Sequence, residues 1–322
     1  MKRLLVILMA GLSLALGGAA ALAQTWPAKP VKVIVPFAPG GPADQLGRMA
    51  AQAITDTMGQ PGVVENKAGA AGNIGVDQIA KAAPDGYTVG VVPVGNIAVN
   101  PSLFPNLPYA ARELTPVAML GVVDNVLVVP ASLPANNLRE LLALARQKPE
   151  GLSFSSPGAG SQAHLAGELL ALESGAKLVH VPYKGMAPAL NDLLAGQVNL
   201  MFAATSTAIP HIQSGKLRAI GVASLRRLAT LPQVPTIAEQ GFAGFEAVSW
   251  YALMAPAATP REVVDKLHAE MTRTVARAEM KERFAAQGME AGSGTPTQLA
   301  ARIAAESARW AEVVKKRNLK PD

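Results

Sequence analysis

Two loops rich in glycine and proline hold the residues best suited to bind an anion. The first is Phe37-Ala38-Pro39-Gly40-Gly41-Pro42 and the second is Ser155-Ser156-Pro157-Gly158-Ala159-Gly160-Ser161, each between a predicted strand and a predicted helix. Glycine lets the backbone approach a ligand, and free N–H groups at a helix N-terminus attract negative charge. We therefore predict an anion site made mainly of backbone. The alternative is that both loops are ordinary tight turns. The candidate contacts in these loops are Phe37, Ala38, Gly40, Gly41, Ser156, Gly158 and Ser161.

Several polar side chains lie close to these loops in the sequence. Asp44 is one turn into the first helix, where it complements the helix dipole or accepts a hydrogen bond from a ligand or a water. His164 is expected to line the site or to hydrogen-bond within its own domain. His164 and Glu168 are four residues apart, but two ligands do not make a zinc site and no third is nearby, so we expect no metal. Lys184-Gly185 also sits between a strand and a helix and can reach the same site.

The motifs of common enzymes are missing. The chain has no cysteine, which excludes disulfides, thiolate metal sites and cysteine nucleophiles. The main alternative among enzymes is an exported α/β hydrolase, which needs the motif G-x-S-x-G and a histidine near the end of the chain. Ser161 has a different context, and His268 falls within an amphipathic helix. The glycines of 69–75 lack the spacing of a dinucleotide loop. We expect no catalytic residue and no cofactor.

Strand and helix patterns alternate along the chain, which indicates an α/β fold with parallel sheets covered by helices. Residues 117–129 read as one strand that is long enough to cross between two lobes. Residues 219–223 are placed to carry the chain back to the first lobe. This gives a first lobe of residues 24–122 and 222–322 and a second lobe of residues 123–221.

The N-terminus has the features of a secretory signal peptide. Lys2 and Arg3 precede an apolar run from Leu4 to Leu16, and Ala21-Leu22-Ala23 offers a small-x-small cleavage site. The apolar run is shorter than the roughly 20 residues of a membrane span, which disfavours the alternative of an uncleaved anchor. We expect residues 1–23 to be removed, export to the periplasm, and a mature chain that begins at about Gln24.

Composition limits the partners. The formal charge of +6 includes Lys2 and Arg3, so the expected mature chain carries 27 − 23 = +4. Basic residues are scattered and aromatic residues make up 4% of the chain, whereas a nucleic-acid groove combines the two. We expect no nucleic-acid binding and a mild attraction for anionic solutes.

Ordered sequence blocks across nearly the whole expected mature chain carry a family resemblance. The chain resembles the substrate-binding proteins of tripartite tricarboxylate transporters, the Bug or TctC type. The matching blocks include 34–44, 65–75, 84–88, 158–169, 181–185, 215–219, 231–236 and 255–260. The resemblance implies a type II periplasmic-binding-protein fold, with two Rossmann-like lobes and a ligand cleft between them. It also implies a small carboxylate ligand, no cofactor, no catalysis, and either membrane permease subunits or a sensor kinase as partner. Separately, we expect a monomer.

One departure from the family bears on the ligand. After the strand 198–202 many relatives carry an aspartate that can serve a ligand amino group, and this chain has Ala203-Ala204-Thr205. Ala203 is therefore a candidate ligand contact. An ammonium group brought into the cleft without a charge partner loses solvation. We expect a preference for di- or tricarboxylates or aromatic acids over aspartate and glutamate, unless another acid supplies the partner.

Overall fold

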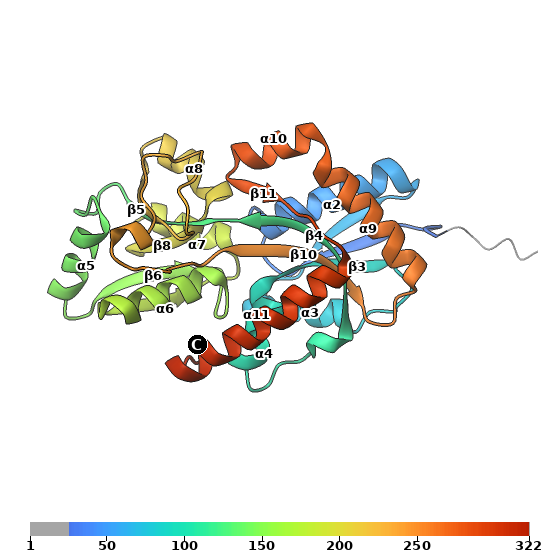
Figure 1. Ribbon diagram of the computed structural model, residues 1–322, viewed down its shortest axis with the longest axis horizontal. Helices are drawn as coiled ribbons and strands as arrows, with labels where there is room; N and C mark the ends of the chain where they lie inside the picture. The colour runs from blue at the N-terminus through green and yellow to red at the C-terminus, as the bar shows by residue number, and fades with distance from the viewer. Residues whose placement is uncertain (1–25, 322) are drawn as a thin grey trace, which may run out of the picture.

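The protein consists of two α/β lobes lying side by side, each built on its own sheet (Figure 1). The computed structural model describes residues 26–321. The expected signal peptide and its cleavage site lie outside the described residues. Within residues 26–321, no helix combines the length and apolarity needed to cross a membrane.

The first sheet has the strand order β11-β4-β10-β3-β1-β2. β1 pairs in parallel with β2 and β3, whereas β10 is antiparallel to β3 and β4. Its strands are β1 (Val31–Val35), β2 (Gly62–Asn66), β3 (Thr88–Pro93), β4 (Leu114–Val123), β10 (Ser249–Pro256) and β11 (Met289–Ala291).

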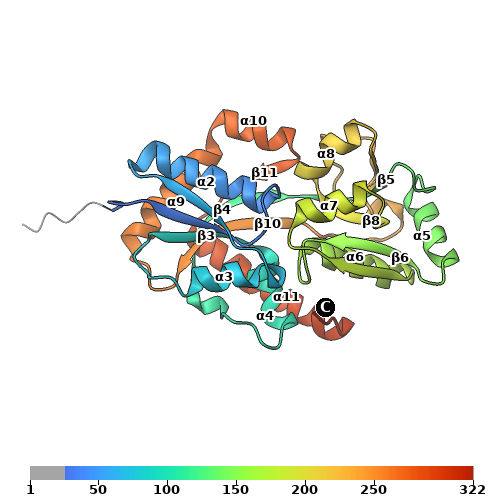
Figure 2. The same ribbon diagram turned by 180° about the vertical axis from the view of Figure 1, so that it is seen from behind.

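Helices cover both faces of this sheet because its strands are apolar on both sides. On β1, Val33 packs into the core beneath α2 and α9, while Ile34 packs into the core beneath α3 and α11 (Figures 1 and 2). The helical segments of this lobe are α2 (Pro42–Met58), η1 (Ala70–Gly72), α3 (Asn73–Ala80), η2 (Gly95–Val99), α4 (Asn100–Leu103), η3 (Ala111–Glu113), α9 (Arg261–Ala276), α10 (Ala278–Ala286) and α11 (Pro296–Arg317).

The second sheet has the order β7-β6-β8-β5-β9, with β6 parallel to β7 and β8. One face packs against α5 and α6, and the other against α7 and α8. The elements are β5 (Asn125–Pro130), α5 (Leu138–Gln147), β6 (Leu152–Ser156), α6 (Gln162–Ser174), β7 (Leu178–Pro182), α7 (Met186–Leu194), β8 (Leu200–Ala204), α8 (Thr205–Gln213), β9 (Leu217–Val222) and η4 (Ala238–Gln240).

The chain crosses between the lobes at two adjacent places. The segment expected as one long strand crosses as two strands, β4 in the first sheet and β5 in the second, with a break at Asp124. The buried side chain of Asn125 joins this crossing to the other one, because its Nδ2 donates to the Ala247 carbonyl and to Ser249 Oγ at 2.7 and 3.1 Å.

The return crossing lies later than the sequence predicts. Residues 219–222 are the last part of β9, which stays in the second sheet and pairs with β5. The loop after it continues in the second lobe, since Ile237, Phe245 and Ala247 are buried in that lobe's core. The chain re-enters the first sheet only at Ser249, where β10 begins. The second lobe needs this loop to complete its core, which the strand pattern alone does not reveal.

Candidate functional site

A cavity lies between the two lobes, at the carboxyl ends of their parallel strands. Its volume is about 40 Å³ for a water-sized sphere, and the atom-free space around its lining, which includes open solvent, is about 560 Å³. Such crevices at strand ends are the usual ligand sites of open α/β sheets. The first lobe contributes Phe37, Gly41, Pro42, Ala43, Ala71, Pro93, Val94, Gly95, Asn96, Asn100, Ser249 and Tyr251, and the second contributes Pro157, Gly160, Ser161, Gln162, Ala163 and Met186.

Two long helices begin at this cavity, one from each lobe. Pro42 and Ala43 open α2, which has 17 residues, and Gln162 and Ala163 open α6, which has 13. Ser161 caps α6 by accepting a hydrogen bond from the His164 N–H. First-turn N–H groups have no acceptor inside a helix, and the described residues provide no other backbone acceptor for those of Ala43, Gln162 and Ala163. Both positive helix ends therefore face the same space.

The lobes touch each other around the cavity, so the structure represents a closed state. The Ala38 N–H of the first lobe donates to the Lys184 carbonyl of the second at 3.1 Å. Glycines allow the closest approaches. A Cβ atom at Gly41 would lie 3.2 Å from Met186 Cβ, and one at Gly95 would lie 2.4 Å from the Gly160 carbonyl oxygen. These glycines permit closure of the lobes.

Several predicted contacts lie at this lobe interface rather than on the cavity wall. Gly40 approaches Ala187, Gly185 approaches Ala38, and Gly158 approaches the backbone of Ala71. Lys184 contributes its backbone carbonyl here, and its side chain is exposed. Phe37, Gly41 and Ser161 are the predicted residues that line the cavity.

The buried carboxylate of Asp44 stabilises the first loop through hydrogen bonds. This carboxylate accepts hydrogen bonds from the Gly40 N–H, Arg48 Nε and Asn66 Nδ2, at 3.0 to 3.1 Å. Burial raises the pKa of Asp44, but the hydrogen bonds from Arg48, Asn66 and Gly40 together outweigh burial and hold this pKa below its usual value. Asn66 Nδ2 also donates to the Phe37 carbonyl. Asp44 is thus an ionised group that shapes the loop and does not line the cavity.

The structure differs from expectation at Ala203. This residue lies in β8, is fully buried in the core, and is not on the cavity wall. It pairs with Val126 of β5 inside the sheet. Ala203 therefore contacts packed core side chains and not the cleft.

Other lining residues were missed because no motif marks them. Asn96 and Asn100 come from η2 and α4, directly after β3, and both donate to Asn73 Oδ1 in a buried amide network. Position after a strand is the one signal that points to them. Tyr251 and Ser249 come from β10, which enters the cleft by its amino end because it runs antiparallel to β3.

The cavity wall is electrically neutral. Among the described residues that line it, Tyr251 alone has an ionisable side chain, and burial raises the pKa of its phenol, so Tyr251 stays uncharged. A bound anion would therefore be stabilised by N–H groups, amides and hydroxyls. Within residues 26–321, no cluster of three histidine or acidic side chains is arranged to hold a metal ion.

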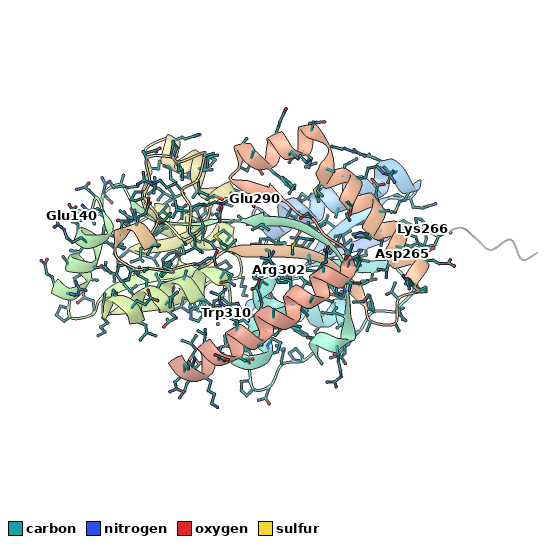
Figure 3. All side chains as sticks on the ribbon, in the orientation of Figure 1. Glu140, Asp265, Lys266, Glu290, Arg302 and Trp310 are labelled. Carbon is teal, nitrogen blue, oxygen red and sulfur yellow. The ribbon has the colours of Figure 1, made fainter. Side chains whose placement is uncertain are left out.

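A second crevice lies beside the crossing strands and has about 1050 Å³ of open space. Glu290 of β11 and Arg302 and Trp310 of α11 line it (Figure 3). Its charged groups largely neutralise one another, because Arg226 pairs with Glu290 and Arg302 pairs with Glu306. Glu306 also accepts a hydrogen bond from Trp250 Nε1. Gln162, the first residue of α6, also lines this crevice, but the N-termini of α2 and α6 meet only at the interlobe cavity among the described residues, and that cavity is the better candidate site.

Comparisons with known proteins agree with this geometry. The family model "Tripartite tricarboxylate transporter family receptor" matches residues 46–319. Protein BugT of Bordetella pertussis is 41% identical over 99% of both chains. The solved structure of the periplasmic binding protein BugD has a TM-score of 0.88 and 37% identity, covering 92% of this chain and all of that one. The structure of R. palustris Rpa4515 with adipate has a TM-score of 0.89 and 34% identity with the same coverage.

These matches confirm the expected two-lobed binding-protein fold. They also confirm the expectation that the chain is not an enzyme, since the family and its structural neighbours are binding proteins. The chain belongs to the tripartite tricarboxylate transporter receptor family, the TctC or Bug type, and is a solute-binding protein of that family.

Proposed function

We propose that this protein captures a small carboxylate in the interlobe cavity and delivers it to the permease of a tripartite tricarboxylate transporter. The observation that carries the proposal is the meeting of two helix N-termini, α2 and α6, in one neutral cavity. Each helix end favours an anion by roughly 0.3–1 kcal/mol, and more where it is partly buried. The adipate held by the relative Rpa4515 is a ligand of this chemical class.

The ligand contacts we propose divide into two kinds. Backbone N–H groups of Ala43, Gln162 and Ala163 hold the carboxylate, with Ser161 beside them. Phe37 and Met186 supply apolar surface for the rest of the ligand. Because no ionised side chain of the described residues lines the cavity, a ligand ammonium would lack a charge partner. We therefore propose an acid without an amino group, either a di- or tricarboxylate or an aromatic acid.

The proposed site of action is the periplasm. The basic start, apolar run and Ala21-Leu22-Ala23 of the sequence support export with cleavage before Gln24. The family model supports the permease as partner, since it is that of a transporter receptor.

A thermal-shift screen of carboxylic acids tests the proposal. A ligand that binds only the folded protein raises the unfolding midpoint by mass action. At least one acid is expected to raise the midpoint and to be recovered unchanged by mass spectrometry. Chemical turnover of the stabilising acid, or no stabilisation by any mono-, di- or tricarboxylate, contradicts the proposal.

A further inference from the structure

Two histidines, His164 buried and His180 partly buried, stack against each other next to the second loop of the site. His164 comes from α6 and His180 from β7, and their ring centroids are 4.1 Å apart. The Phe154 ring contacts both, with its centroid 5.0 Å from that of His180 and 6.4 Å from that of His164. His164 was a predicted ligand contact, but it is 2% exposed and does not line the cavity. His180 has no evident role in ligand contact either.

Both imidazoles are joined to the loop by hydrogen bonds. The Gly160 N–H lies 3.1 Å from His164 Nδ1. An N–H group can only donate, so His164 Nδ1 is the acceptor and carries no proton. Ser156 Oγ lies 2.6 Å from His180 Nε2 and accepts a hydrogen bond from the Gly158 N–H at 3.0 Å. The hydroxyl of Ser156 donates to His180 Nε2 or to the Gly158 carbonyl 3.1 Å away, according to which ring nitrogen of His180 carries the proton.

We infer that His164 and His180 are positioning residues that fix the shape of the loop 156–160 through two imidazole hydrogen bonds. The inference rests on the proposed function, because this loop leads into the α6 N-terminus that faces the ligand. His164 acts on Gly160 directly, and His180 acts on Gly158 through Ser156. The two bonds hold glycines whose φ angles are +133° at Gly158 and +77° at Gly160. The N–H groups of Gln162 and Ala163 are thereby left directed toward the cavity.

The hydrogen bonds depend on the protons of the two imidazoles. Protonation of His164 Nδ1 turns an acceptor into a donor and removes its bond to the Gly160 N–H, whereas a proton on His180 Nε2 makes this nitrogen a donor to Ser156 Oγ. Glu168 faces the pair from α6, with its Oε1 3.7 Å from His164 Nε2, and Glu173 lies near the end of the same helix. The neighbouring strands β6 and β8 carry no ionisable side chain. Burial lowers the pKa of His180 to about 4, so this ring is neutral above that pH and gains a proton as the pH falls through it.

Substitutions by side chains of similar size, with and without a hydrogen-bonding group, separate loop positioning by the imidazoles from simple packing. His180→Leu and His164→Leu fill the space without an acceptor. His180→Gln and His164→Asn keep an amide oxygen near the position of the lost ring nitrogen. The measurement is amide hydrogen exchange of Gly158 and Gly160 by NMR in the full mature protein without ligand, with global stability measured by urea unfolding.

We expect His180→Leu to speed the exchange at Gly158, and His164→Leu that at Gly160, by about tenfold. The amide variants should stay within about threefold of the unaltered protein. In the unaltered protein, the Gly158 amide signal should shift as the pH falls through about 4, where His180 gains its proton, and His180→Gln should lack this shift. Unchanged exchange in the leucine variants, or equal acceleration in the leucine and amide variants, overturns the inference. Because no ligand is used, these outcomes are distinct from failure of the carboxylate screen.

Discussion

Gly95→Ala tests whether ligand binding needs the closed contact between the lobes. Gly95 is the first residue of η2 in the first lobe and is buried against Gly160 of the second lobe. Its φ angle is not in the left-handed region, so alanine fits the local backbone. The added methyl group would lie 2.4 Å from the Gly160 carbonyl oxygen. A comfortable C···O contact is about 3.3 Å, so the lobes must stop about 1 Å short of the observed closure.

The size of the effect follows from this overlap. Overpacking of this kind costs about 1–3 kcal/mol, and it acts on the closed state while leaving an open, ligand-free state unaffected. Because each 1.4 kcal/mol changes an equilibrium tenfold, we expect the Kd to rise by about 5- to 150-fold. The unfolding midpoint without ligand should stay within about 2 °C of the unaltered protein.

Isothermal titration calorimetry with the acid that stabilises the protein most provides the measurement. Ser102→Ala is a matched control, because Ser102 is exposed on α4 a few residues further along the same segment. It should bind with unchanged affinity. If Gly95→Ala binds within twofold of the unaltered protein, the lobes do not need this contact and the closure argument is refuted.

Three further predictions concern the ligand, the first loop and export. In calorimetric titrations, succinate, citrate or a benzoate-type acid should bind more tightly than aspartate and glutamate, and tighter binding of either amino acid than of every amino-free acid would overturn this preference. Asp44→Ala should destabilise the protein by about 1–3 kcal/mol, because the Gly40 N–H and Asn66 Nδ2 lose a buried partner. Because the folded state holds the pKa of Asp44 below its usual value, the contribution of Asp44 to the free energy of unfolding should be present above about pH 4 and lost as the pH falls through the folded pKa. Urea unfolding of both proteins from pH 2 to 7 checks this. An equal difference in the free energy of unfolding between the two proteins at pH 2 and at pH 7 would contradict it. Intact mass of the periplasmic protein should correspond to a chain that starts at or near Gln24, whereas a full-length chain in the membrane fraction would rule out cleavage.

The sequence predicted the alternation of strands and helices well, because apolar runs such as 31–35 and 249–254 are distinct. It also located the two glycine-rich loops that meet at the cavity. It could not predict the later return crossing, since the packing of Phe245 into the second lobe depends on contacts distant in sequence. The expected long strand instead breaks at Asp124, where the chain changes sheets.

Individual site residues were harder to predict than loops. Asp44 has the sequence position of a ligand contact, yet its carboxylate is occupied by Gly40, Arg48 and Asn66. Ala203 is next to the end of a strand, but the side-chain alternation of β8 turns it into the core. Conversely, Asn96 and Tyr251 line the cavity, but they belong to segments that contain no recognisable sequence motif. Which way a side chain faces is set by tertiary packing, and one sequence does not supply this information.

The crystal structure of the mature protein with its most stabilising acid tests the central claim most directly. We predict a carboxylate group between the N-termini of α2 and α6, with its oxygens within about 3.2 Å of backbone nitrogens from the set Ala43, Gln162 and Ala163. An acid bound in the crevice lined by Glu290 and Arg302, or held in the cavity without any of these N–H groups, would contradict the account.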